Sequence, residues 1–206
     1  MFERAKEYLE KESGSNCDVF RGIISPVNNG YGEKKNLIAA NHRVKMTQLA
    51  IDDISPHLDW LQCSDWESLQ TGWTRTIDVL QHFRQELRTE FPTEPQPHLK
   101  LLCGSDLLET FAKPGLWADE DIQKIVANYG LVVMSRMNNN ISDFINSKPV
   151  LFEHRDKIMI IRETIGGEDV SSTRIRTALS SGNKITFFVQ PSVVRYIEAQ
   201  SLYKTN

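Results

Sequence analysis

The sequence predicts an α/β protein with a parallel β-sheet that is covered by helices on both faces. Apolar runs of strand length lie at residues 19–27, 99–104, 130–136 and 157–161, and helical segments separate them. Continuous apolar runs are typical of strands buried on both faces, whereas half-exposed strands alternate apolar and polar residues. A repeated strand–helix–strand order favours parallel pairing.

The first part of the chain starts with a predicted helix at residues 1–11, which has apolar residues at helical spacing. The strand at 19–27 ends at Ser25-Pro26, and a lysine-rich loop of turn-forming residues follows at 28–36. Further along we expect a helix at 40–53 and a short strand at 58–63.

The second part carries an amphipathic helix at 73–91, then an exposed loop with three prolines at 91–97. The strand at 99–104 follows this loop at once, so the prolines do not mark a domain boundary. With 206 residues, we expect a single domain over 1–206.

Composition restricts the classes of partner. Apolar residues make up 40% and charged residues 25%, as in globular proteins, and no apolar run has the length of about 20 residues that spans a bilayer. A net charge of −3 gives no global attraction to nucleic acid or to a membrane surface. We therefore expect neither as a partner.

Three widely spaced cysteines, Cys17, Cys63 and Cys103, favour reduced thiols inside a cell over a disulfide framework. The five histidines lack the spacing of a zinc site, so we expect no metal bound by the protein alone.

The segment Glu168–Arg176 follows a strand and begins a helix that continues through Leu179. Hydroxyl side chains and N–H groups at a helix start can bind an anion, and Arg174 and Arg176 add donors suited to phosphate oxygens. The same residues are equally consistent with a well-capped helix that carries two surface arginines.

Gly104 and Asp106 stand at the carboxyl end of a predicted strand, where open parallel sheets bind ligands. Gly104 would let a nucleotide approach the backbone, and the carboxylate of Asp106 would accept from ribose hydroxyls. By spacing alone, a simple strand-to-helix turn with Asp106 as a cap is the favoured alternative.

Trp73 and Trp117 offer faces that can stack on a heterocycle, and Lys34 offers a charge for a phosphate. Tryptophans are more often core residues, and loop lysines are usually only solvated. The glycine fingerprint of dehydrogenases and the P-loop are both absent from the sequence.

Several stretches together resemble the eukaryotic nicotinamide-mononucleotide adenylyltransferases. The similar stretches are Gly22–Val27, Asp65–Trp73, Leu101–Glu109, Pro114–Trp117, Ile125–Leu131 and Val170–Arg176. The last is similar to the family signature I-S-x-T-K/R-I-R. The resemblance implies a Rossmann-like nucleotidyltransferase fold of the cytidylyltransferase-like kind.

The resemblance also implies roles for matching residues. Those expected to bind nicotinamide mononucleotide are Lys34, Trp73, Thr76, Leu116 and Trp117. Those expected to bind ATP or NAD are Gly104, Asp106, Arg136, Glu168, Thr173, Arg174, Ile175 and Arg176. Glu168 stands where the family often has Asn, and a carboxylate does not supply an amide's donor.

The activity implied is the formation of NAD, or of deamido-NAD, and pyrophosphate from ATP and nicotinamide or nicotinic acid mononucleotide. Mg²⁺ would enter with ATP, and homo-oligomers are implied. The alternative is a non-catalytic isoform or fragment that binds nucleotide or acts as a chaperone-like interaction module. Another adenylyltransferase, acting on pantetheine phosphate, is disfavoured by the two tryptophan segments.

The N-terminus departs from the family, whose members begin with a strand and a loop resembling G-S-F-N-P-x-T-x-x-H-L-R. This chain starts just after that loop. We therefore expect the first, central strand of the sheet and part of the phosphate site to be missing, and the chain to be N-terminally truncated. A cytoplasmic or nuclear location is expected, and organelle targeting stays open.

Overall fold

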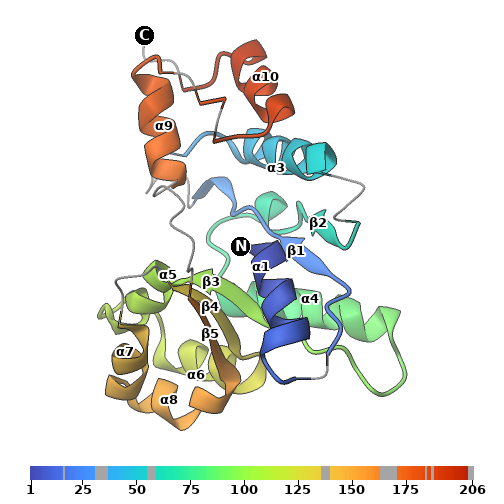
Figure 1. Ribbon diagram of the computed structural model, residues 1–206, viewed down its shortest axis with the longest axis vertical. Coiled ribbons are helices and arrows are strands. Elements are labelled where there is room, and N and C mark those ends of the chain that lie inside the picture. Colours follow the sequence, from blue (N-terminus) through green and yellow to red (C-terminus); the bar gives the residue numbers. More distant parts are fainter. Residues whose placement is uncertain are drawn as a thin grey trace. The chain divides into compact units, whose positions relative to one another are not determined.

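The chain folds into two compact units in a computed structural model, which describes residues 1–15, 17–30, 37–54, 59–135, 140–162, 171–183, 185–186 and 188–203. The first unit comprises Met1–Val19 and Arg75–Gly166, and the second comprises Phe20–Thr74 and Gly167–Asn206 (Figure 1). Each unit is described by itself below. The expectation of one domain over 1–206 stays a prediction.

A three-stranded parallel sheet forms the centre of the first unit. Its order is β3 (Leu101–Gly104), β4 (Leu131–Ser135) and β5 (Ile158–Arg162). Leu131 of β4 is in register with Leu101 on one side and with Ile158 on the other. The carboxyl ends of all three strands therefore lie at one edge of the sheet, which is where such sheets bind ligands.

Side chains along β4 point alternately to the two faces of this sheet, and both faces are buried. Leu131 and Val133 of β4 belong to one core cluster, whereas Val132 and Met134 belong to the other. Successive strand residues point to opposite faces, so a strand covered on both sides must be apolar throughout. All five residues of β4 are buried, which confirms the interpretation of the continuous apolar run.

Helices cover the two faces (Figure 1). Ala5 and Leu9 at the N-terminus pack on one face, and the larger cluster on the other takes its apolar side chains mainly from α4, α6, α7 and α8. The helical segments are α1 (Phe2–Glu7), η1 (Tyr8–Glu12), α4 (Thr76–Glu90), α5 (Ser105–Glu109), η3 (Thr110–Ala112), α6 (Asp119–Asn128), α7 (Ile141–Ser147), α8 (Pro149–Glu153) and η4 (Arg155–Lys157).

Gly130 makes the turn from α6 into β4. Its φ is 74°, a left-handed conformation that L-residues with a side chain disfavour. A Cβ at this position would lie 2.7 Å from the carbonyl oxygen of Lys157. Glycine is therefore required here both by backbone conformation and by the close approach of a second backbone segment.

The second unit holds a two-stranded parallel sheet and three longer helices. β1 (Gly22–Ile24) pairs in parallel with β2 (Leu61–Cys63), so that Gly22 faces Leu61. The helical segments are α3 (Ala40–Ile54), η2 (Glu67–Leu69), α9 (Ser172–Ser180) and α10 (Pro191–Ala199). Apolar residues of α3, α9 and α10 pack around a small core of Ile185, Val193 and Ile197.

The predicted parallel α/β class is confirmed, with differences in extent. The strand expected at 19–27 is only three residues long, because Pro26 has no N–H for a sheet and Phe20 is exposed. The five described strands form two parallel sheets of two and three strands. None of the helices in the described ranges is long and apolar enough to cross a membrane.

All three cysteines are free thiols, but their surroundings differ. Cys17 is exposed, Cys63 is half-buried and Cys103 is buried in β3. Burial raises the pKa of Cys103 to about 12, and burial likewise raises that of Cys63 to about 11. Both therefore stay protonated near neutral pH and serve as packing residues.

Candidate functional site

The first group of candidate site residues lies where β3 ends. Gly104 is the last residue of β3 and the N-cap of α5, which has no side-chain cap hydrogen bond. Asp106 is exposed, and its carboxylate lies so close to Gly104 that a Cβ at residue 104 would collide with it. The Asp106 carboxylate has no hydrogen bond within the described residues, so it does not cap α5, and glycine leaves room for it beside the strand end.

Trp117 and Leu116 lie shortly before α6. The indole N–H of Trp117 donates to the hydroxyl of Thr110 at 2.9 Å, and its ring meets Phe111 edge-on with centroids 4.8 Å apart. These contacts hold a half-buried ring against the core cluster. Leu116 is 52% exposed, so its side chain is accessible to a ligand. Thr110, which fixes the indole, carries no motif in the sequence that would have indicated this contact.

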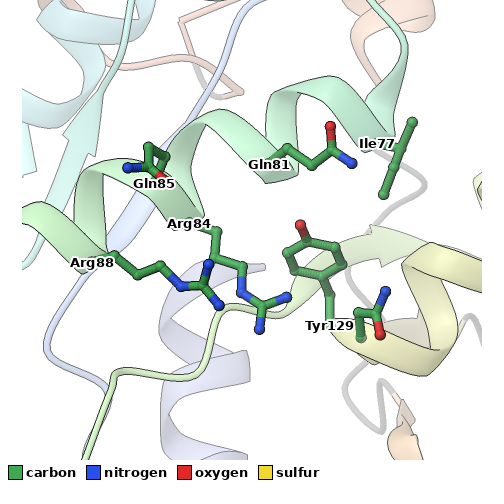
Figure 2. Close-up of a pocket in the computed structure, with 7 residues that line it drawn as sticks. Ile77, Gln81, Arg84, Gln85, Arg88 and Tyr129 are labelled. Carbon is green, nitrogen blue, oxygen red and sulfur yellow. The ribbon is translucent and has the colours of Figure 1, made fainter. Parts of the chain in front are cut away.

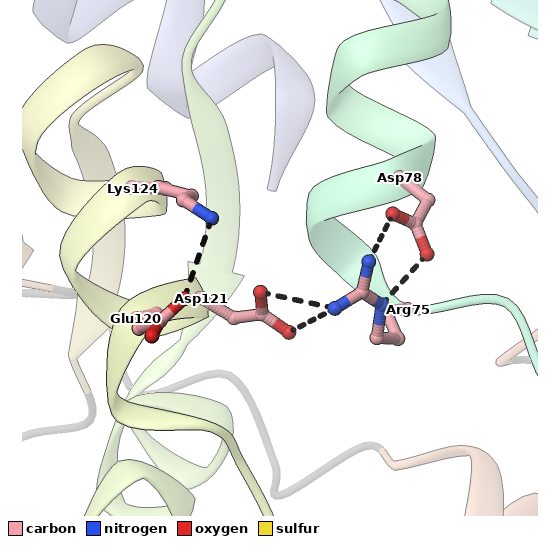
Figure 3. A network of polar contacts seen from close by, with 5 residues as sticks. All are labelled: Arg75, Asp78, Glu120, Asp121 and Lys124. Atoms are coloured by element: carbon pink, nitrogen blue, oxygen red, sulfur yellow. Dashed lines mark hydrogen bonds and ion pairs between the residues drawn. The ribbon is translucent and has the colours of Figure 1, made fainter.

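A forked ion pair fixes the start of α4, where Thr76 is the first helical residue (Figure 3). Arg75 donates from Nε and Nη2 to the two carboxylate oxygens of Asp78 at 2.9 and 2.8 Å. Its Nη1 also donates to Asp121 of α6 at 3.2 and 3.3 Å. The Asp78 hydrogen bond is the largest cause of the raised pKa of Arg75.

This ion pair positions functional candidates because α6 begins two residues after Trp117. Asp121 is buried, so its charge is well placed to hold Arg75 and thereby to connect α4 with α6. Arg75, Asp78 and Asp121 were not among the residues singled out from the sequence. Asp78 is within one turn of Arg75 and was recognisable in principle, but the pairing with Asp121 across 46 residues was not.

The start of α9 carries the second group of candidates. The hydroxyl of Ser171 accepts from the N–H of Arg174 at 3.3 Å, and this is an N-cap. The first two helical N–H groups, those of Ser172 and Thr173, have no acceptor within the described part of the chain. The structure thus combines a capped helix start with N–H donors that point out of it. The two interpretations of this segment, as a capped helix and as an anion site, are therefore compatible.

The side chains of Arg176 and Ile175 near the start of α9 make different contacts. Arg176 donates to the hydroxyl of Thr173 at 3.3 Å, which holds its guanidinium over the helix start. Ile175 instead packs against the small core of the second unit, and its N–H donates to the carbonyl of Ser171. Any ligand contact of Ile175 would therefore be indirect, through its place in the turn.

Cationic and phenolic groups meet in the second unit near α9. Burial raises the pKa of Tyr203, and the charges of Arg176 and Arg43 oppose that rise. Burial also lowers the pKa of Arg43, which donates to the carbonyl oxygens of Ile38 and Asn28 at 2.9 and 3.2 Å. The positive potential of Arg176 is thus supplemented by Arg43, a residue that no local sequence pattern indicated.

The turn that presents Trp73 is held by a buried asparagine. Asn28 is 3% exposed, and its amide donates to the carbonyl of Gly72 and to the hydroxyl of Thr74. These bonds fix the residues on both sides of Trp73, whose own side chain is 51% exposed. The Asn-Asn-Gly signal predicted only a loop here, so the positioning role of Asn28 could not be inferred from local sequence.

Glu67 is a buried carboxyl group in the second unit. It is 7% exposed and accepts from the Ser25 hydroxyl at 2.7 Å. Burial raises the pKa of Glu67, while the Ser25 hydrogen bond and the charge of Arg43 oppose that shift. The bond joins the segment after β1 to η2.

The raised pKa of Glu67 makes stability depend on pH. The folded state binds the Glu67 proton more tightly than the unfolded state, so this contribution is complete below the unfolded pKa, about 4.3, and is lost as pH rises through the folded pKa. Relative to Glu67→Gln, the free energy of unfolding of the wild-type chain should therefore fall over that interval. Urea unfolding of both proteins in a pH series tests this, and parallel pH profiles would contradict it.

Three predicted site residues, Lys34, Arg136 and Glu168, lie outside the described residues. Of the others, Thr76, Gly104, Asp106, Leu116 and Trp117 belong to the first unit, and Trp73, Thr173, Arg174, Ile175 and Arg176 belong to the second. The structure brings Gly104 next to Asp106 and Thr173 next to Arg176.

Comparisons with known proteins show which proteins this chain is similar to. Residues 1–178 match the cytidylyltransferase-like family. The whole chain is 36% identical to nicotinamide/nicotinic acid mononucleotide adenylyltransferase 1 of Bos taurus and covers 83% of it. Identity is 38% to nicotinamide-nucleotide adenylyltransferase of Drosophila melanogaster and 35% to nicotinamide/nicotinic acid mononucleotide adenylyltransferase 2 of Saccharomyces cerevisiae, over 98% of this chain in both cases. The chain spans about half the length of these last two relatives, 56% and 51%.

Proposed function

Because the chain belongs to the nicotinamide/nicotinic acid mononucleotide adenylyltransferase family, we propose that it transfers the adenylyl group of ATP to nicotinamide mononucleotide. The products are NAD and pyrophosphate. Nicotinic acid mononucleotide, which the relatives' names also include, is proposed as a second substrate that yields deamido-NAD. The observation that carries the proposal is the similarity over the whole chain to relatives with this named activity.

The reaction needs no protein nucleophile. An oxygen of the mononucleotide phosphate attacks the α-phosphorus of ATP, a P–O bond forms there, and the bond to the leaving pyrophosphate breaks. The protein contributes by positioning the two phosphates and by stabilising the charge that develops on their oxygens. We therefore look to cationic and hydrogen-bonding residues for the main contributions.

In the second unit, Thr173, Arg174 and Arg176 are proposed to bind the phosphates of ATP. Support comes from the two helical N–H groups without an acceptor and from the guanidinium of Arg176 above them. The exposed ring of Trp73 is proposed to stack on the pyridine base. Lys34 is proposed to meet the mononucleotide phosphate, Arg136 and Glu168 to contact ATP or NAD, and Ile175 to keep the turn in place.

In the first unit, Asp106 is proposed to accept hydrogen bonds from the adenosine ribose while Gly104 lets the ribose approach. The exposed carboxylate at the carboxyl end of β3 supports this role. Leu116 and Trp117 are proposed to line the space for the pyridine base, and Thr76 to contact it from the start of α4. The Thr110 hydrogen bond supports this by fixing the Trp117 ring.

Mg²⁺ is proposed to enter bound to ATP. Within the described ranges, no group of three histidine, cysteine or carboxylate side chains is placed to hold a metal ion. Arginines and helix N–H groups suit a site for a metal–nucleotide complex, whose phosphates and waters complete the magnesium coordination. The ion would neutralise charge on the phosphate oxygens when bound.

A direct assay tests the proposal. The purified 206-residue chain is incubated with Mg-ATP and either nicotinamide or nicotinic acid mononucleotide, and products are separated by chromatography and identified by mass. We expect NAD and deamido-NAD, each with one equivalent of pyrophosphate. Pantetheine phosphate serves as the control acceptor. Absence of both dinucleotides, under conditions in which the bovine relative makes them, would refute the activity of this chain.

A further inference from the structure

A shallow hollow of about 250 Å³ lies on the surface of the first unit, beside α4 and the segment that leads into the amino end of β4 (Figure 2). Four of its lining residues, Gln81, Arg84, Gln85 and Arg88, lie on one stripe of α4. Asn128 and Tyr129 close it from the end of α6. The lining is thus composed mainly of hydrogen-bond donors, with two positive charges and no carboxylate.

The two arginines are placed one helical turn apart, at i and i+4. Like charges at this spacing repel each other and destabilise a helix unless something neutralises them. Within the described part of the chain, neither Arg84 nor Arg88 forms an ion pair or hydrogen bond through its guanidinium. Figure 2 shows both side chains extending from the same side of α4 into the hollow.

The ring of Tyr129 contacts one of the two guanidinium groups. The Arg84 guanidinium carbon lies 5.5 Å from the centroid of the Tyr129 ring, a cation–π contact. The cation–π contact uses none of the N–H donors, and these have no acceptor among the described residues, so they stay available for an anion. Tyr129 is itself buried, so the surrounding core keeps its ring in place.

We infer that this hollow is a binding site for a phosphate-type oxyanion, either free or as the phosphate group of a larger molecule. Two guanidinium forks match the paired oxygens of phosphate, and the amide groups of Gln81, Gln85 and Asn128 add neutral donors at the rim. The site is separate from every residue proposed above to bind substrates, and it does not depend on the proposed activity.

Titration calorimetry at constant ionic strength tests this site. All titrations use the full chain with Arg174→Gln and Arg176→Gln, because the start of α9 is itself proposed to take phosphates. We expect this parent to bind phosphate saturably. Adding Arg84→Gln and Arg88→Gln should weaken phosphate binding at least about tenfold, because hydrogen bonds from a charged donor contribute more to affinity than those between neutral groups. Lys in place of both arginines should give intermediate affinity, since it keeps the charge without the fork.

Charge-matched and folding controls keep the result specific. Lys11→Gln with Lys124→Gln removes two exposed charges from the same unit and should leave the phosphate affinity unchanged. In the absence of phosphate, Arg84→Gln with Arg88→Gln should keep or slightly raise the midpoint of thermal unfolding, because the repulsion is removed. The affinities for inorganic phosphate and glycerol phosphate are compared. Tighter binding of the first indicates a site for free phosphate, and tighter binding of the second indicates a site for the phosphate group of a larger molecule.

Two results would overturn the assignment. One is phosphate binding by the Arg84→Gln, Arg88→Gln protein within twofold of its parent. The other is the absence of saturable binding of both phosphate and glycerol phosphate by the parent.

Discussion

Replacing Gly130 with Ala is expected to destabilise the protein by about 2–5 kcal/mol. The left-handed backbone costs a residue with a Cβ about 1–2 kcal/mol. The methyl group would also lie 2.7 Å from the carbonyl oxygen of Lys157, and relieving such overpacking typically costs a further 1–3 kcal/mol, roughly. Because Lys157 directly precedes β5, the required shift would disturb the pairing of β4 and β5. Urea unfolding followed by circular dichroism measures the loss.

Gly14→Ala provides a matched control. Gly14 has almost the same φ, 71° against 74°, and belongs to the same unit, and no atom of the described residues lies within 4 Å of the position of an added Cβ. Its substitution should therefore cost only the backbone contribution of about 1–2 kcal/mol. Equal losses for the two variants would show that the approach to Lys157 does not matter, and would contradict the explanation for Gly130.

Replacing Arg174 and Arg176 together with Gln is expected to lower the rate of NAD formation by about 100-fold or more. Removing one preorganised donor from a developing charge typically costs about 100- to 1,000-fold in kcat. Both arginines stand at the start of α9, where Arg176 is held by Thr173. The apparent affinity for ATP should fall as well, because the ground-state phosphates lose the same partners. Initial rates at varied ATP concentration separate the two effects.

Lys45→Gln with Arg195→Gln is the control for this pair. It removes two positive charges from the same unit at positions on α3 and α10. Activity close to that of the unmodified chain is expected, since no substrate contact is assigned to either residue. A similar decrease in both double variants would attribute the effect to net charge and would disprove a specific role for the α9 start.

The main elements were predictable because each rests on a local signal that tertiary packing reinforces. The continuous apolar run of β4 already implied burial on both faces, and the structure places alternate residues of it in two different core clusters. The N-cap at Ser171 was predictable for the same reason, since serine is a preferred residue at the N-cap, where its hydroxyl accepts from the N–H three residues later.

Features that depend on distant segments were not predictable. Nothing near Asp121 in the sequence indicates that it pairs with Arg75, and nothing near Asn28 indicates that its amide holds the turn before Trp73. The position of the Asp106 carboxylate also needed the structure, because a carboxylate at the start of a helix usually indicates a cap. Here α5 has no side-chain cap, and Gly104 explains where the carboxylate lies instead.

The differing environments of the three cysteines limit how the protein responds to oxidants. Peroxides and disulfides react with thiolates, and the raised pKa values of Cys63 and Cys103 leave almost no thiolate at either position at neutral pH. Cys17 is the exposed thiol, so each chain presents one reactive sulfur to another chain. A molecule with a single reactive group can be joined covalently to one neighbour but cannot be extended further. Oxidation of the folded protein would thus end at disulfide-linked pairs, and longer covalent polymers would require prior unfolding.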